Sequence, residues 1–325
     1  MAPGTRAVKR LDRWGWLLAA TIVHGGAVAT EPTATTAAAV QPATETVDAS
    51  GRPINVSQIV ERVRSARYVL LGEIHDNPRH HRLRAALLRS LLADGVPTRV
   101  VFEQMDRQHN AAIAAAPRDT EAIVEAGRLD RKGWAWPLHR PLFDAALEGG
   151  AAVVAGNLGR AQASQVVRGG LTQAPPDLHH LLSPAGEAAA EGRAAWTAAL
   201  EAELLRLVEE GHCGALPRSM LAPMALAQRS RDAALASAMS QAPAGTRVVL
   251  IAGNGHVRRD IGVPHYLAVA DKLSPDDSRI VSIGFLERSS EGKTSVDGPY
   301  DEAWFTERVE RPDPCASFSP PTAPK

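Results

Sequence analysis

The stretch that decides the fold is Tyr68-Val-Leu-Leu-Gly-Glu-Ile-His75-Asp-Asn-Pro-Arg-His80-His81. Its first four residues form a continuous apolar run, which is typical of a strand buried on both faces of a parallel sheet. Asn77 followed by Pro78 predicts a helix N-cap with proline at the first helical position, and leucines then recur at helical spacing. Glu73 and His75 therefore lie between a strand and a helix, the position at which doubly wound α/β proteins bind ligands.

Other apolar runs repeat this arrangement. Residues 99–103 end on Glu103, and residues 247–252 are followed by Gly253-Asn-Gly-His256. Residues 151–155 and 279–286 have the pattern of two more strands, and helical patterns separate most of these runs. The alternation predicts an α/β fold with a mainly parallel central sheet and flanking helices.

A long helical stretch, residues 160–239, interrupts this alternation. Prolines and glycines divide it into pieces, and it contains no clear strand pattern. We therefore expect a helical insertion, which could form a lid over the sheet. Residues 133–141 are too rich in proline and tryptophan to lie inside a helix.

The N-terminal region has the form of an export signal. Basic residues precede an apolar run at residues 14–23, and Ala27-Val-Ala29 has the small-x-small form of a cleavage site. We expect a signal peptide over residues 1–29, with an uncleaved anchor as the alternative, and a periplasmic or secreted protein. An Ala/Thr/Pro-rich linker (30–46), one domain (47–315) and a disordered tail (316–325) should follow.

Charge and cysteine content bear on nucleic-acid binding, lipid anchoring and disulfide formation. The chain has 36 basic and 36 acidic residues, and loss of the basic leader makes it slightly acidic, so no nucleic-acid partner is expected. Neither Cys213 nor Cys315 stands directly after the apolar run of the leader, so there is no site for a lipid-modified cysteine. In an oxidising compartment we predict that these two cysteines form a disulfide, which would hold the proline-rich C-terminal segment.

Three strand-like runs lead to His75, Glu103 and His256. If the strands are parallel neighbours, two imidazoles and a carboxylate converge at one edge of the sheet, and such a set suits a divalent transition metal. A single G-x-x-H sequence is a weak signal, but this chain has one at each of two strand ends. The alternative for each histidine is a hydrogen bond within its own loop.

Further side chains near these motifs are candidates for ligand binding. They are His81 and Tyr266 as ligands, Arg258 and Arg259 as partners of an anionic group such as a propionate, and Trp134 and Trp136 as an aromatic wall. A neutral imidazole can bind a metal, Tyr266 could line the same crevice, and arginine binds carboxylates in bidentate fashion. Each candidate also has an ordinary alternative as a solvated surface residue or a packing residue.

Seven ordered motifs resemble the ChaN-like haem-binding uptake family, in the superfamily that also holds Tiki metalloproteases, TraB-type proteins and erythromycin esterases. They are Leu-Leu-Gly-Glu-Ile-His75-Asp-Asn, Val-Phe-Glu103-Gln, Trp134-Ala-Trp-Pro, Val-Ala-Gly-Asn157-Leu, His212-Cys-Gly-Ala-Leu-Pro217, Met224-Ala-Leu-Ala-Gln-Arg-Ser-Arg-Asp232 and Gly-Asn-Gly-His256-Val-Arg-Arg-Asp-Ile-Gly-Val-Pro264. The resemblance implies an exported α/β protein connected with haem or iron acquisition. The metal-site pattern of the superfamily maps onto His75, Glu103 and His256.

Two functions compete at this point. The leading expectation is binding of haem or iron in the crevice at the strand ends, with a homodimer that covers the haem and an outer-membrane uptake receptor as candidate partners. The alternative is a metal-dependent hydrolase, a Tiki-like peptidase or an esterase. In that case a metal held by His75, Glu103 and His256 would activate water, and Glu73 would act as general base.

Overall fold

In a computed structural model of the chain, the residues described are 45–183, 195–274, 276–289, 291, 294, 296 and 298–316. The predicted signal peptide, most of the predicted linker and all but the first residue of the predicted tail lie outside them. Strand β1 (Glu45–Asp48) begins inside the segment predicted as linker, so regular structure starts slightly before residue 47.

The described residues form one seven-stranded sheet in the order β1-β7-β6-β2-β5-β3-β4. The strands are β1, β2 (Tyr68–Leu71), β3 (Thr98–Asp106), β4 (Ala152–Asn157), β5 (Arg247–Ile251), β6 (Ile280–Glu287) and β7 (Glu302–Thr306). All pairings are parallel except that of β1 with β7. The predicted α/β class and its five strands are confirmed, whereas β1 and β7 were not predicted.

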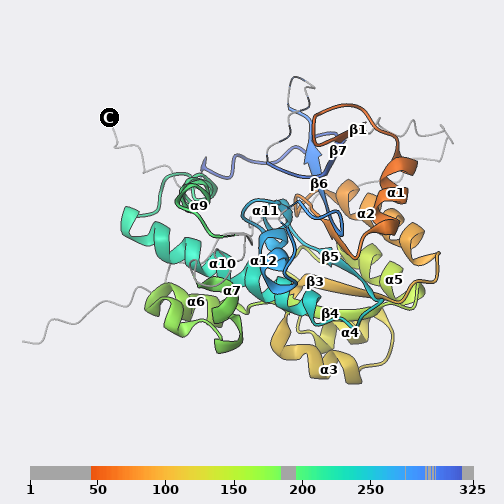
Figure 1. Cartoon of the computed structure of the whole chain (residues 1–325), viewed down its shortest axis with the longest axis horizontal. Coiled ribbons are helices and arrows are strands. Elements are labelled where there is room, and N and C mark those ends of the chain that lie inside the picture. Colours follow the sequence, from red (N-terminus) through yellow and green to blue (C-terminus); the bar gives the residue numbers. More distant parts are fainter. Residues whose placement is uncertain are drawn as a thin grey trace, which may run out of the picture. The chain divides into compact units, whose positions relative to one another are not determined.

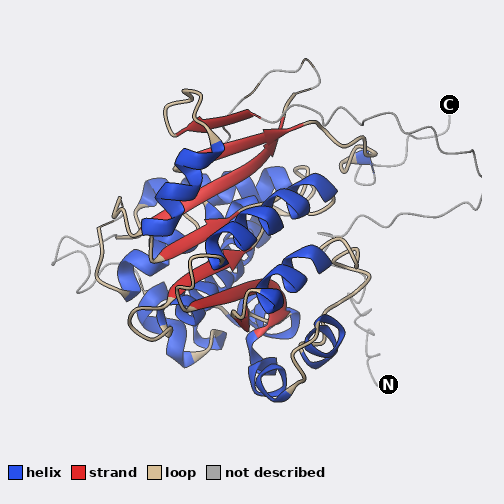
Figure 2. Ribbon diagram, turned by 90° about the vertical axis from the view of Figure 1, so that its right-hand side faces the viewer, coloured by secondary structure: helices blue, strands red, loops and turns tan. Residues whose placement is uncertain are grey.

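Helices cover both faces of the sheet (Figures 1 and 2). The longer ones are α1 (Val56–Ser65), α2 (Pro78–Leu92), α5 (Arg140–Glu148), α6 (Arg160–Gly169), α9 (Ala198–Gly211), α10 (Arg218–Ser240) and α12 (Val263–Ala270). The shorter ones are α3 (Asn110–Ala115), α4 (Thr120–Ala126), α7 (His179–Leu182) and α11 (Asn254–Val257). One apolar core joins α1, α2 and α5 to the sheet, and a second joins α6, α10 and α12 to its other face.

The predicted helical insertion is present as α6 to α10, but α10 is not part of a lid. Its alanine-rich face, with Ala233, Ala234 and Ala236 fully buried, packs on the sheet as a layer of the fold. As predicted, a disulfide joins Cys213 and Cys315. It attaches the C-terminal segment to the turn between α9 and α10.

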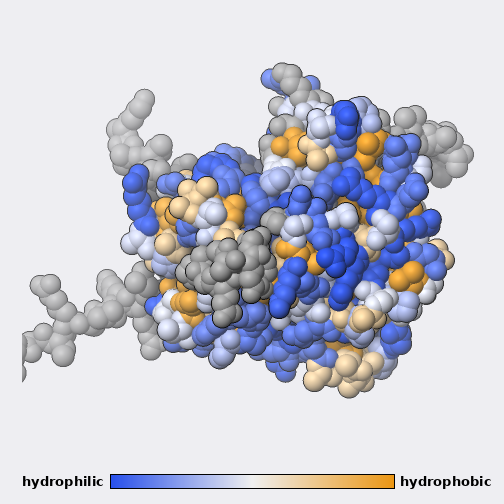
Figure 3. All heavy atoms as spheres, viewed as in Figure 1, coloured by the Kyte–Doolittle hydropathy of each residue, from blue (hydrophilic) through white to orange (hydrophobic). Residues whose placement is uncertain are grey.

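Among the described helices, none is long and apolar enough to cross a membrane. The face in Figure 3 is largely hydrophilic, with hydrophobic side chains in small separate groups.

The register of the central strands brings the ends of β2, β5 and β3 to the same level. Leu71 of β2 and Phe102 of β3 both pair with Ile251 of β5, so these three residues lie in one row across the sheet. The loops that follow the three strands therefore start at the same level. Asn77 caps α2 through the backbone N–H of Arg79 at 2.9 Å, which fixes where the first of these loops ends.

Candidate functional site

The loops after β2 and β5 are fixed to one another by close backbone contacts. A Cβ at Gly72 would lie 2.2 Å from Oδ1 of Asn254, so only glycine fits there without movement. The backbone N–H of Asn254 donates to the carbonyl of Glu73 at 3.0 Å. The Asn254 amide also exchanges two hydrogen bonds with the backbone of Phe285 in β6. The site is therefore built on a rigid frame.

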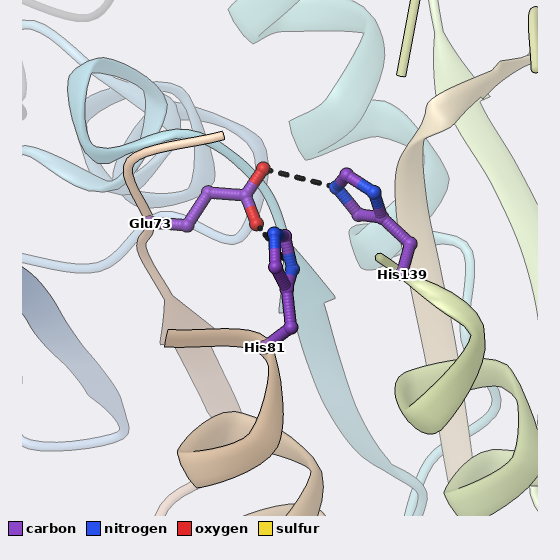
Figure 4. A group of neighbouring side chains, drawn as sticks. All are labelled: Glu73, His81 and His139. Carbon is purple, nitrogen blue, oxygen red and sulfur yellow. Dashed lines mark hydrogen bonds and ion pairs between the residues drawn. The ribbon is translucent and has the colours of Figure 1, made fainter. Parts of the chain in front are cut away.

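Glu73 is the centre of a buried polar cluster, part of which Figure 4 shows. Its Oε1 lies 2.5 Å from Nδ1 of His75 and 3.2 Å from Nε2 of His139. Its Oε2 lies 3.2 Å from Nδ1 of His81 and forms an ion pair with Arg84. Because both oxygens are enclosed and the side chain is buried, Glu73 is not open to a water molecule as the predicted general base would be.

These contacts fix the state of His75. Its Nδ1–H donates to Glu73, so Nε2 carries the lone pair in the neutral ring. Burial lowers the pKa of His75, against the opposing charge of Glu103, which favours the neutral form. The side chain is 34% exposed. His75 therefore offers an oriented, neutral nitrogen ligand at the edge of the sheet.

His81 and His139 are buried behind His75. Nε2 of His81 donates to the carbonyl of His75 at 2.9 Å, and Nδ1 of His139 donates to the carbonyl of Trp134 at 3.2 Å. Burial lowers the pKa of each of the two imidazoles to about 3, so both are neutral. Their remaining nitrogens face Glu73.

Arg84 supplies the counter-charge of this cluster. Its guanidinium pairs with Glu73, donates to the carbonyl of Leu71 at 3.1 Å, and lies 2.9 Å from Nδ1 of His81. Complete burial lowers the pKa of Arg84 to about 9, although the charge of Glu103 opposes the shift. Arg84 therefore stays charged at neutral pH and provides the cation that pairs with Glu73.

The second G-x-x-H histidine has a different environment. Nδ1 of His256 lies 2.5 Å from Oδ1 of Asp232, and its Nε2 lies 3.2 Å from Oε1 of Glu103. Burial alone would lower the pKa of His256, but the charges of Glu103 and Asp232 raise it to about 10. His256 is therefore an imidazolium between two carboxylates, and neither nitrogen has a free lone pair.

The predicted metal ligands His75, Glu103 and His256 lie at one edge of the sheet, but they do not all offer a free ligand atom. Nε2 of His75 and Oε2 of Glu103 lie 3.5 and 3.8 Å from the position that a Cβ at Gly253 would occupy. The carboxylates on both sides of His256 occupy its nitrogens. Among the described residues, the group whose ligand atoms all lie within 4.8 Å of one another is instead Glu73, His81 and His139.

Several other predicted ligand-binding residues have protein partners. Tyr266 is completely buried, and its hydroxyl lies 3.2 Å from Nε of Arg229. Arg258 pairs with Asp260 and Glu203, and Arg259 pairs with Asp301 at 3.3 Å. His81 is also fully buried, with both nitrogens engaged. These side chains are held by the protein itself, which differs from the predicted roles at an open crevice.

The two predicted aromatic residues differ in position. The ring of Trp134 meets that of His75 edge-on, with 4.8 Å between their centroids. Trp136 packs on Phe143 and under the guanidinium of Arg131. Trp134 is therefore the one that adjoins the exposed histidine.

Sequence reasoning missed His139, Arg84 and Asp232. His139 directly follows the Trp-Ala-Trp-Pro-Leu stretch, and Asp232 ends one of the seven motifs, so both positions carried a signal. Arg84 stands among leucines in α2 and has the pattern of an exposed residue, although it is completely buried.

The sequence of residues 59–267 matches the family described as haem-binding uptake, Tiki superfamily, ChaN. The chain belongs to this ChaN family. No curated protein sequence matches it significantly.

Among solved structures, this ChaN-family chain is similar to ChaN of Campylobacter jejuni, with a TM-score of 0.62 and 18% identity over 80% of this chain and 96% of that one. A mutant erythromycin esterase, EreC, in its open conformation matches with a TM-score of 0.41 and 16% identity, over 76% of this chain and 78% of that one.

Proposed function

We propose that this chain binds haem at the carboxyl ends of β2, β5 and β3, with Nε2 of His75 as a ligand of the iron. The observation that carries the proposal is the pairing of Nδ1 of His75 with Glu73 at 2.5 Å while the side chain stays 34% exposed. Histidines that bind metals usually donate their other ring N–H to a carboxylate or carbonyl, which orients the ring and makes the nitrogen a better ligand. Membership in a haem-binding family supports the same ligand.

The surroundings of His75 fit a porphyrin in two respects. An imidazole nitrogen is a common axial ligand of haem iron. The ring of Trp134, edge-on to His75, offers apolar contact beside it. When bound, the iron would supply the redox and ligand-exchange chemistry, and this chain would hold and orient it.

We further propose a homodimer and a role in haem or iron uptake outside the cytoplasm. The ChaN structure from C. jejuni is described as showing cofacial haem binding. In this chain, a homodimer would cover a haem face left exposed by one protomer. The family description as uptake proteins and the leader-like residues 1–29 support export and an outer-membrane receptor as partner. Cell fractionation tests the location, and a full-length protein confined to the cytosol would contradict it.

Titration of the apo-protein with haem, followed by the Soret band, tests the binding site. Wild type should bind saturably, and His75→Ala should lose roughly tenfold to hundredfold in affinity, because the ligand nitrogen is gone. His81→Ala and Tyr266→Ala should keep the ligand-dependent spectrum. Absence of saturable binding in folded wild type would falsify haem binding, and an unchanged spectrum in His75→Ala would refute the choice of ligand.

A second candidate function is metal-dependent hydrolysis, and one observation favours a metal. Nε2 of neutral His139 faces Oε1 of Glu73 at 3.2 Å, so two acceptors oppose each other where a cation would satisfy both. With His81 they form a two-histidine, one-carboxylate set, which suits a divalent transition metal. Arg84 competes for the same carboxylate.

Metal analysis of protein purified from its native compartment, combined with a panel of peptide and ester substrates, tests the second function. Stoichiometric metal that is lost in His139→Ala, together with metal-dependent turnover, would support it. Metal-free or inactive wild-type protein would leave haem binding as the single proposed function.

A further inference from the structure

We propose that Arg231 binds a carboxylate of the ligand held by His75, which for haem is a propionate. This inference rests on the proposed haem site and adds a second anchor to it. It also replaces Arg258 and Arg259 in the role that the sequence suggested for them.

Arg231 differs from the buried arginines because it has no carboxylate within ion-pair distance in the described part of the chain. Its one hydrogen bond runs from Nη1 to Oδ1 of Asn157 at 3.2 Å, and the side chain is half-buried. The buried arginines, namely Arg84, Arg229, Arg247 and Arg258, each lie within ion-pair distance of a carboxylate. A half-buried guanidinium that is not directly paired with a carboxylate suits an anionic ligand.

The contact with Asn157 positions Arg231 without neutralising it. Nδ2 of Asn157 donates to the backbone carbonyl of Glu103 at 2.9 Å, so the amide oxygen must face Arg231. The amide oxygen of Asn157 accepts one N–H of Arg231 and carries no net charge. The rest of the guanidinium fork is left for another acceptor.

Arg231 lies at the same edge of the sheet as His75. It precedes Asp232, which binds His256, and His256 in turn contacts Glu103. Asn157 ends β4, and the order β2-β5-β3-β4 places it beyond Glu103 as seen from His75. The guanidinium of Arg231 and Nε2 of His75 would therefore contact different parts of one extended ligand.

Arg231 lies among charges of both signs. Burial lowers its pKa, the charges of Glu103, Asp106 and Asp232 oppose this shift, and that of Arg160 adds to it. Asp232 is already paired with His256. Glu103 is already engaged by His256 and by the backbone N–H of Gly253 at 2.8 Å. Haem carries its two propionates at one edge of the ring, to one side of the iron, and a guanidinium binds such a group with two parallel hydrogen bonds.

The test compares iron protoporphyrin IX with its dimethyl ester, which has the same iron and ring but no carboxylates. Wild type should bind the diacid about tenfold to hundredfold more tightly than the diester, since hydrogen bonds to charged groups have this effect on affinity. Arg231→Met should lose the preference by weakening the diacid alone. Arg231→Lys, which keeps the charge without the fork, should retain part of it.

Arg107→Met is the matched control, because Arg107 is also partly buried but pairs with Asp177 at 2.8 Å. This variant should keep the wild-type preference. Equal binding of diacid and diester by wild type would overturn the inference while leaving haem binding intact. A preference that survives in Arg231→Met but vanishes in Arg258→Met would overturn it in favour of the sequence-based assignment. Failure of wild type to bind either compound would instead remove the proposed function.

Discussion

The two G-x-x-H motifs place similar histidines at neighbouring strand ends in opposite chemical states. His75 touches one carboxylate through Nδ1, has a lowered pKa and is partly exposed. His256 touches a carboxylate through each nitrogen, has its pKa raised to about 10 and is buried. Both rings have a carboxylate at Nδ1, Glu73 for His75 and Asp232 for His256, so the difference lies at Nε2, which in His256 meets Glu103 at 3.2 Å.

The G-x-x-H motif therefore fixes where each histidine lies, and the neighbouring side chains decide its chemical role. A histidine with one carboxylate behind it keeps a lone pair for a ligand. A histidine between two carboxylates becomes a fixed positive charge that holds them together.

The largest expected effect is on stability. His256→Ala leaves Glu103 and Asp232 buried without the cation between them, so the free energy of unfolding should fall by ~3–5 kcal/mol. His75→Ala should cost only ~1 kcal/mol, because Glu73 keeps its ion pair with Arg84. Urea unfolding of both variants measures the difference. Equal losses would show that the two histidines do not differ in role.

The pH dependence of stability should differ in sign between His256 and the buried pair His81 and His139. His256 has a folded pKa of about 10, above its ordinary value of 6.5, so its contribution is complete below pH 6.5 and is lost as pH rises through about 10. The pKa values of His81 and His139 fall to about 3, so their contributions are complete above pH 6.5 and are lost as pH falls below it.

Urea unfolding of wild type and His256→Ala, measured below pH 6.5 and near pH 10, checks the direction of both pH effects. The gap in stability between the two proteins should shrink as pH rises from 6.5 to about 10. Acid destabilisation below pH 6.5 should persist in the variant, since His81 and His139 remain. A gap that widens at high pH would contradict the assigned state of His256.

The smallest expected effect concerns the ligand nitrogen alone. Gly253 has φ −68°, so alanine fits its backbone, but the new Cβ would lie 3.2 Å from Cε1 of His75. Gly253→Ala should therefore turn the ring and weaken haem binding by about tenfold, or ~1.4 kcal/mol, with little loss of stability.

Gly255→Ala is the control for Gly253→Ala, because a Cβ at Gly255 meets no atom within 4 Å. Haem titration of both variants makes the comparison. If the two variants bind haem equally well, the Nε2 side of His75 is not where the ligand lies.

Much of the fold follows from the sequence because its strands are continuous apolar runs. The four residues of β2 are completely buried, as their composition predicts, and the Asn77–Pro78 pair fixes the start of α2. Strands β1 and β7 were missed because polar residues interrupt their apolar pattern, and β1 also lies next to an Ala/Thr/Pro-rich segment.

The site was predictable in its location but not in its contacts. Parallel strands bring Glu73, His75, Glu103 and His256 to one edge, which a pattern of strand ends indicates. Their partners Arg84 and Asp232 come from helices, and His139 lies in the turn just before α5. Which way a helix turns a polar side chain depends on tertiary packing. Tyr266 illustrates the limit, because helical spacing alone did not show that it faces the core.

The position of β5 between β2 and β3 also has a consequence for folding. β2 ends at Leu71, but its sheet partner β5 begins at Arg247, so the pairing closes a very long loop. Strands that pair over such separations form late, because the entropy of loop closure must be overcome before their contacts form. His75 and Glu103 cannot meet around Gly253 until β5 has inserted, so ligand binding would report completion of the sheet.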